Sequence, residues 1–206
     1  MAAEFFRWMS ISGLSVLSSP QPQEGKKMAW VFRAVVILLA IVLSACSAVY
    51  TTAPVGDTAV QLISEEWQGT WLGDEVVVVT TVLDREKGLL QVAWIERSMD
   101  GAILETQQSY IRSSGDFMFA SARDKDAEEP RYIWIRVDRS QSKLITWAPN
   151  LKTFQTMVRE GRFPGTVNDD GVMLGELTPQ QLEMINTPSS DLLDWEEPRV
   201  FIRIAD

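Results

Sequence analysis

Apolar and polar residues alternate with the two-residue period of β-strands through most of the chain after residue 69. The four valines at residues 76–79 centre a predicted strand over residues 70–83, because consecutive β-branched residues favour strand over helix. Five further strands are predicted at short intervals, over residues 90–95, 102–113, 117–119, 131–138 and 143–147. The turns between them are short and include the hairpin signal Asp100-Gly101, so an antiparallel meander is expected.

A helical period replaces the alternation in three places. Short helices are predicted over residues 58–67, 151–158 and 178–185, the second capped by Asn150 and the third by Thr178 followed by Pro179. Extended segments at residues 163–174 and 199–204 bring the strands to about eight. The predicted fold is therefore mainly β: an antiparallel meander of about eight strands that forms a closed barrel or a curved sheet, with two or three short helices.

The N-terminal part has a different pattern, an unbroken apolar run over residues 34–45. This run is shorter than the roughly 20 residues of a membrane-spanning helix, and Lys26, Lys27 and Arg33 precede it, as in an export signal. It ends in Leu43-Ser44-Ala45-Cys46, which resembles the lipobox of bacterial lipoproteins. The resemblance implies cleavage before Cys46 and acylation of that cysteine; the alternative is an uncleaved transmembrane anchor starting near Ala29.

Three regions follow from these patterns. Residues 1–45 are interpreted as an N-terminal extension plus signal peptide, with Met28 as an alternative start. Residues 46–57 are small and polar and are interpreted as a flexible tether, and residues 58–206 as a single β-rich domain. The predicted location is the cell envelope, with Ser47 compatible with an outer-membrane lipoprotein that faces the periplasm.

Composition narrows the function. Removal of residues 1–45 leaves 15 Lys and Arg against 26 Asp and Glu, a formal charge near −11, which argues against nucleic acid as a partner. The chain has no histidine, and Cys46 is its only cysteine. Ser-His-Asp and Cys-His catalysis and zinc sites of the usual His and Cys type are thereby excluded within this chain, and no cofactor is expected.

The start of the first strand carries a second resemblance. Gly69-Thr70-Trp71, preceded by a short helix, is similar to the Gly-x-Trp signature of lipocalins. In that family the tryptophan plugs one end of the barrel and an arginine near the last strand packs on it, a role that the resemblance gives to Arg203 or Arg199. The chain departs from the family in lacking a Thr-Asp-Tyr type motif and in placing helices before its last strand.

The candidate ligand-binding residues are six aromatic side chains on predicted strands, whose alternative role is plain core filling. They are Trp94, Phe117, Phe119, Tyr132, Trp134 and Trp147. The acidic segments 124–129 and 168–171 lack the glycine spacing of a calcium loop and are interpreted as a solvated loop and a turn. Arg159 and Arg162 are candidates for contacts with a partner or an anionic ligand, with surface charge as the simpler interpretation.

The sequence thus predicts a non-enzymatic, lipid-anchored envelope protein that binds a hydrophobic small molecule or lipid in a barrel-like pocket. One alternative is a protein-interaction or assembly module with a filled core and an exposed apolar patch that includes Trp195 or Phe163. A second alternative is a carboxylate-based hydrolase, which requires two facing carboxylates. The residues to test for it are Asp169, Asp170, Glu96 and Glu105.

Overall fold

A computed structural model describes residues 48–205 of the chain, apart from residues 75, 99, 100, 126 and 141. The predicted export segment, Cys46 and Ser47 lie outside the described residues. Within the described part, no helix combines the length and the apolar character that crossing a membrane requires.

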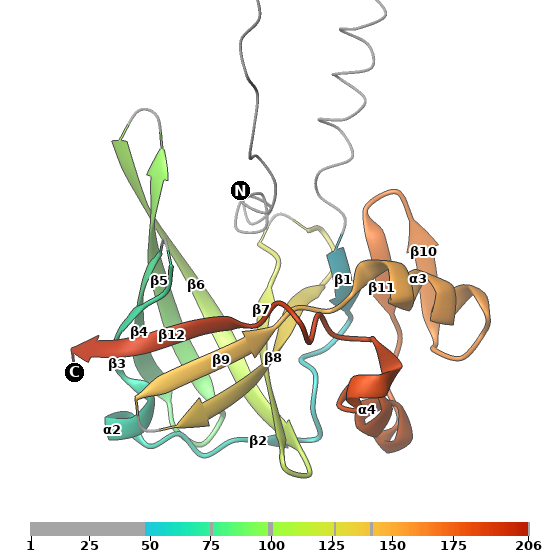
Figure 1. Cartoon of the computed structure of the whole chain (residues 1–206), viewed down its shortest axis with the longest axis horizontal. Coiled ribbons are helices and arrows are strands. Elements are labelled where there is room, and N and C mark those ends of the chain that lie inside the picture. Colours follow the sequence, from blue (N-terminus) through green and yellow to red (C-terminus); the bar gives the residue numbers. More distant parts are fainter. Residues whose placement is uncertain (1–47, 75, 99–100, 126, 141, 206) are drawn as a thin grey trace, which may run out of the picture. The chain divides into compact units, whose positions relative to one another are not determined.

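Eight strands close into an antiparallel barrel (Figure 1). Seven of them follow one another as an up-and-down meander in which each strand pairs with the next, from β3 to β9. The last strand, β12, lies between β9 and β3 and completes the ring. The bounds are β3 Gly69–Leu72, β4 Val77–Asp84, β5 Leu89–Ser98, β6 Gly101–Ser114, β7 Phe117–Arg123, β8 Tyr132–Ser140, β9 Lys143–Trp147 and β12 Arg199–Ala205. The predicted mainly β meander is confirmed, and the sheet is closed rather than open.

The strands of the ring differ from the predicted set in two places. The predicted strand over residues 70–83 is a hairpin of β3 and β4, in which the amide of Gly73 donates to the carbonyl of Val76. The extended segment 163–174 forms the hairpin β10 (Gly165–Asn168) and β11 (Gly171–Leu174), which lies outside the barrel. The count of barrel strands is right because these two differences cancel.

The predicted flexible tether is wrong from Ala48 onward. Ala48–Thr51 form strand β1, which pairs in parallel with β11 and in antiparallel with the start of β8. Val49, Tyr50 and Thr51 are each buried. After β1 the chain runs along the barrel to a two-residue strand, β2 (Thr58–Ala59), which pairs with β6. The segment is too short to show a periodic pattern, and its partners lie far away in the sequence.

Two of the three predicted helices begin at the residues that the capping signals predict. Helix α3 (Leu151–Arg159) begins at Asn150, whose side chain accepts a hydrogen bond from the amide of Thr153. Helix α4 (Pro179–Ile185) begins with a capping box between Thr178 and Gln181. The helix predicted over residues 58–67 is only the single turn α2 (Ser64–Trp67), because residues 58–59 pair in the sheet.

The inward faces of the barrel strands form one hydrophobic core. Leu90, Ile111 and Val137 come from β5, β6 and β8 and are at most 5% exposed. Leu62 and Trp67 cover them from the segment around α2. Burial of each such side chain contributes about 1.5–3 kcal/mol, so this cluster is a main source of barrel stability.

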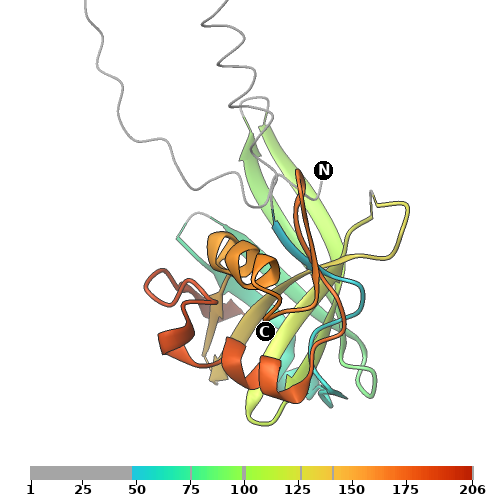
Figure 2. The ribbon, with the colours of Figure 1, turned by 90° about the vertical axis from the view of Figure 1, so that its right-hand side faces the viewer.

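A second core lies outside the barrel, between the outer face of β7–β9 and the segment from α3 to α4 (Figure 2). Phe119 and Trp134 point outward from β7 and β8, and their rings meet edge to face at 5.9 Å. Trp134 packs in the same way on Phe154 of α3, and Phe154 packs on Phe163. All four side chains are at most 2% exposed. The helical segment is therefore an integral part of the fold.

Candidate functional site

One end of the barrel is plugged by Trp71, which is completely buried. Its indole Nε1 donates a hydrogen bond of 2.9 Å to Thr80 Oγ1 on the neighbouring strand. The Thr80 hydroxyl in turn donates to the carbonyl of Trp67 in α2. This chain of hydrogen bonds joins the plug to the helix that closes the same end.

Arg203 on β12 completes the plug. Its guanidinium carbon lies 5.5 Å from the centre of the Trp71 ring, Nη1 donates to the Glu65 carbonyl at 2.7 Å, and Nη2 donates to the Gln68 carbonyl. Gly69 has a φ of 146°, and a Cβ there would lie 2.9 Å from Arg203 Nε. The structure thus brings Gly69, Trp71 and Arg203 together in the arrangement that the lipocalin resemblance implies, whereas Arg199 begins the same strand and pairs with Thr146.

The opposite end of the barrel presents an inner face of mixed character. Strand register places Val78, Trp94 and Glu105 side by side on the inward face of β4, β5 and β6. Gln107 follows Glu105 on the same face of β6. Trp94 is 8% exposed, while Val78, Glu105 and Gln107 are only partly buried. We call this the open end, because Val78, Glu105 and Gln107 are partly accessible and no buried plug like Trp71 covers them in the described part of the chain.

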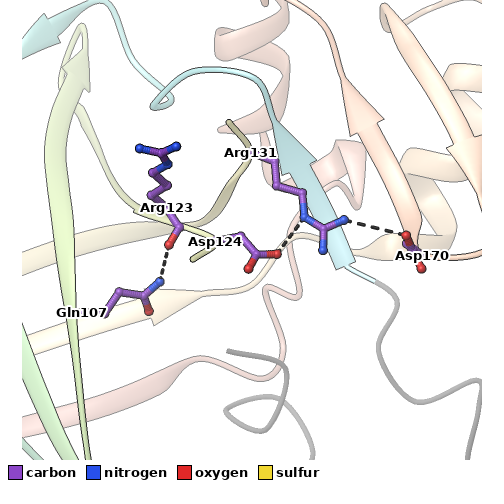
Figure 3. A network of polar contacts seen from close by, with 5 residues as sticks. All are labelled: Gln107, Arg123, Asp124, Arg131 and Asp170. Carbon is purple, nitrogen blue, oxygen red and sulfur yellow. Dashed lines mark hydrogen bonds and ion pairs between the residues drawn. The ribbon is translucent and has the colours of Figure 1, made fainter. Parts of the chain in front are cut away.

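A polar network holds the rim of the open end (Figure 3). Asp124, whose side chain is 5% exposed, accepts a hydrogen bond of 2.7 Å from Arg131 Nε. Arg131 Nη1 lies 3.8 Å from Asp170 in the turn between β10 and β11, and its guanidinium stacks on Tyr50 of β1. On the other side of the rim, Gln107 Nε2 donates to the Arg123 carbonyl. Arg131 thereby ties the β7–β8 loop to β1 and to the β10–β11 turn, and Gln107 ties β6 to the end of β7.

The charges of this network act on Arg131. Burial alone lowers the pKa of Arg131, but the hydrogen bond from Arg131 to Asp124 and the nearby negative charges raise that pKa overall. The guanidinium therefore stays charged at every accessible pH. Because the Asp124 carboxylate is almost completely buried, Arg131 supplies the compensating charge that such a burial requires.

Of the six predicted ligand-binding aromatic residues, only Trp94 points into the barrel. The prediction is wrong for the other five, because the two-residue period carries them to the outer face. Phe117, Phe119, Trp134 and Trp147 belong to the core outside the barrel. Tyr132 packs edge to face on Tyr110 at 6.2 Å, also outside. The wider inner face was missed because sequence alone does not show which side of a strand is inward; the pairing of Trp94 with Glu105 across the hairpin fixes it.

The candidate carboxylates are not brought together. Asp169 and Asp170 lie in the β10–β11 turn, whereas Glu105 lies on β6, with β1, β8 and β7 between them in the sheet. Adjacent strands are about 4.8 Å apart, so these groups do not face each other across a cleft. The side chain of Glu96 lies outside the described part. In that part no group of three His, Cys, Asp or Glu residues is placed to hold a metal ion.

The remaining candidates lie at the helical segment. Arg159 and Arg162 are exposed, and Arg162 lies 4.0 Å from Glu160, so both are surface charges. Phe163 is 2% exposed, and Trp195 packs on Trp147 at 5.5 Å. The predicted apolar patch is therefore not at these two residues, which belong to the outer core.

No protein-family model matches the chain, no curated protein is significantly similar to it, and no solved structure matches it significantly. The function must therefore be argued from the barrel and its two ends.

Proposed function

We propose that the chain is a lipid-anchored envelope protein that binds an apolar or amphiphilic small molecule inside its barrel, through the open end. The observation that carries this proposal is the asymmetry of the barrel. One end is plugged by Trp71 and Arg203 beneath α2, and the inward side chains of the other end are partly accessible. A closed eight-stranded barrel of this size holds one small ligand or is filled by side chains.

The chemistry of the inner face indicates the class of ligand. Val78, Val92 and Trp94 offer an apolar wall, and the small side chain of Ala122 points inward from β7. Glu105 and Gln107 offer a carboxylate and an amide close to the rim. An apolar body with a neutral or cationic polar head matches this arrangement, because the head meets hydrogen-bonding groups while the body contacts the wall.

The place where the chain enters the sheet supports the membrane part of the proposal. The amide of Ala48 donates a hydrogen bond of 3.2 Å to the Asp170 carbonyl, in the turn that Arg131 ties to the rim of the open end. A lipid on Cys46, two residues earlier, would hold that end near the membrane. Apolar ligands partition into the bilayer, so the entrance would lie next to their source.

Filling the inner face tests ligand binding. Ala122→Phe adds a large side chain on the inward face of β7, and Ala93→Phe is the matched control because Ala93 points outward from β5. Native mass spectrometry of the intact protein purified from its own envelope should show a bound small molecule in the wild type and in Ala93→Phe, and should show its loss in Ala122→Phe. An unchanged apo mass for the wild type, with no hydrophobic probe bound, would contradict the proposal.

The anchor has a separate test. Intact-mass analysis of the membrane-extracted protein should show cleavage before Cys46 and the added mass of acyl chains. The Cys46→Ala variant should lose both and leave the membrane fraction. An unprocessed chain of full mass in the membrane would instead support the uncleaved anchor, and would leave the ligand proposal unaffected.

A further inference from the structure

The outer surface of the barrel carries a row of apolar side chains that cross-strand pairing places side by side. The partners run Ile202, Leu72, Val77, Ile95 and Leu104, one on each of β12, β3, β4, β5 and β6. All point away from the inner core. Leu104 is 66% exposed, Ile202 51%, Ile95 47% and Leu72 46%, which is unusual for aliphatic side chains on adjacent strands.

Neighbouring rows extend this surface, and Lys143 on β9, which pairs with Ile202, is the charged residue at its margin. Val79, Val200 and Ile204 point the same way and are 41–56% exposed. Four strands supply the other outward positions around this surface: β3, β4, β5 as far as Ile95, and β6 from Leu104 to Tyr110. These positions hold Thr, Gln, Ala, Leu and Tyr, and the one charged residue among them is Asp84, at the very end of β4. We call the eight residues Leu72, Val77, Val79, Ile95, Leu104, Val200, Ile202 and Ile204 the apolar face.

The area and shape of the apolar face suit a protein surface. Its side chains expose on the order of 600 Å², at the upper end of what the largest patch on a typical monomer shows. With the uncharged Thr and Gln side chains between them, the area approaches the roughly 800 Å² that each partner contributes to a standard interface. From β12 to β5 the strands under this face are paired on both sides, so a partner packs on it face to face as two sheets do. At Leu104 the pairing is one-sided, because β7 pairs with β6 only from Ser109 onward.

Charge and position favour a second copy of this chain as that partner. The chain has a formal charge of −9, so two copies repel each other wherever their acidic surfaces meet. The apolar face itself carries no acidic side chain, with Lys143 beside Ile202 as its charged neighbour on β9, and an apolar surface is complementary to itself. The face is centred on β4, which lies opposite β8 in the ring, while the N-terminal strand β1 pairs with β8. The face therefore points away from the side on which the chain enters the fold.

We propose that the apolar face joins two copies of the chain in a two-fold symmetric dimer. Such an interface brings the same residues of both copies together around the axis. The interface uses outward side chains, whereas the proposed ligand contacts are inward side chains of the same strands, so the two proposals rest on different faces of the sheet. The dimer also leaves strand β1 of each copy on the side of the barrel away from the interface.

Cysteine cross-linking in intact membranes tests the dimer. Cys46 is the only cysteine, so the wild type reports any background from that position. Val79→Cys lies on the apolar face, and Thr166→Cys on the exposed strand β10 is the matched control. A short bismaleimide should give a product of twice the chain mass from Val79→Cys and not from Thr166→Cys. Only monomer from Val79→Cys, equal products from both, or a product with the mass of a different protein would each overturn the proposal.

A charge on the apolar face provides the second measurement. Ile202→Glu places like charges across the axis and should weaken the dimer about 100-fold, measured by sedimentation of the detergent-extracted protein. Because Ile202 is 51% exposed, the melting temperature of the separated chain should stay near that of Ile202→Thr, which also removes the apolar side chain. A folded Ile202→Glu variant that sediments like the wild type would refute the dimer.

Discussion

Removal of the Arg203 guanidinium should destabilise the plugged end of the barrel and lower the free energy of unfolding. In Arg203→Ala, two hydrogen bonds to the carbonyls of Glu65 and Gln68 and the contact over Trp71 are all lost. Hydrogen bonds from a charged donor contribute about 1.5–3 kcal/mol each and a guanidinium–indole contact about 1–2 kcal/mol. Arg203 is only half-buried and water can replace part of what it donates, so the expected loss of unfolding free energy is about 3 kcal/mol.

A urea titration of the purified chain, followed by tryptophan fluorescence, measures this loss. Arg203→Lys keeps the charge and most of the stem but cannot bridge two carbonyls, so about half of the loss is expected. Arg123→Ala is the matched control, because Arg123 is also an arginine on a barrel strand but its side chain is exposed. If Arg203→Ala costs less than about 1 kcal/mol, or no more than Arg123→Ala, the plug does not stabilise the barrel and the reasoning from the lipocalin resemblance fails.

Three further changes test other parts of the fold. Thr80→Val leaves the buried indole N–H of Trp71 without its acceptor and should cost about 1–3 kcal/mol in urea titrations, whereas Thr80→Ser should cost less. Gly69→Ala should destabilise the chain by a similar amount, because the new Cβ meets Arg203 and φ is positive; a melting temperature equal to the wild type would contradict this. Burial raises the pKa of Asp194, so the contribution of Asp194 to stability should fall as pH rises from 3.8 through its folded-state pKa, and Asp194→Asn should be more stable relative to the wild type at pH 7 than at pH 3. Stability curves of the two proteins that run parallel across this range would refute the assignment.

Local chemistry predicted most elements of this fold. Strand β9 has the predicted bounds, and both longer helices begin at the residues whose side chains cap them. These signals are readable because each depends on neighbours within four residues. The hairpin between β3 and β4 was missed because the valine run on one side of Gly73 resembles a continuation of the strand on the other.

The features that the sequence did not predict depend on contacts between residues far apart along the chain. Phe119 and Trp134 look like barrel lining in the sequence, and they face outward only because a separate helical segment covers them. Strand β1 is four residues long and pairs with β11, whose residues come more than a hundred positions later. The plug residues were found because Gly69 and Trp71 stand two positions apart, whereas Thr80, which holds the indole, gives no comparable local signal.

The position of β1 sets the maximum distance between the barrel and a lipid attached to Cys46. A lipid on Cys46 would be separated from the hydrogen-bonded strand by Ser47 alone, since Ala48 already pairs with Gly171. An extended chain covers about 3.5 Å per residue. The linker from a lipidated Cys46 to the first paired residue, Ala48, would therefore span only about 7 Å. If Cys46 carries a lipid, the barrel is held within that distance of the membrane surface. Such an anchor would limit any ligand exchange to the leaflet that holds the lipid.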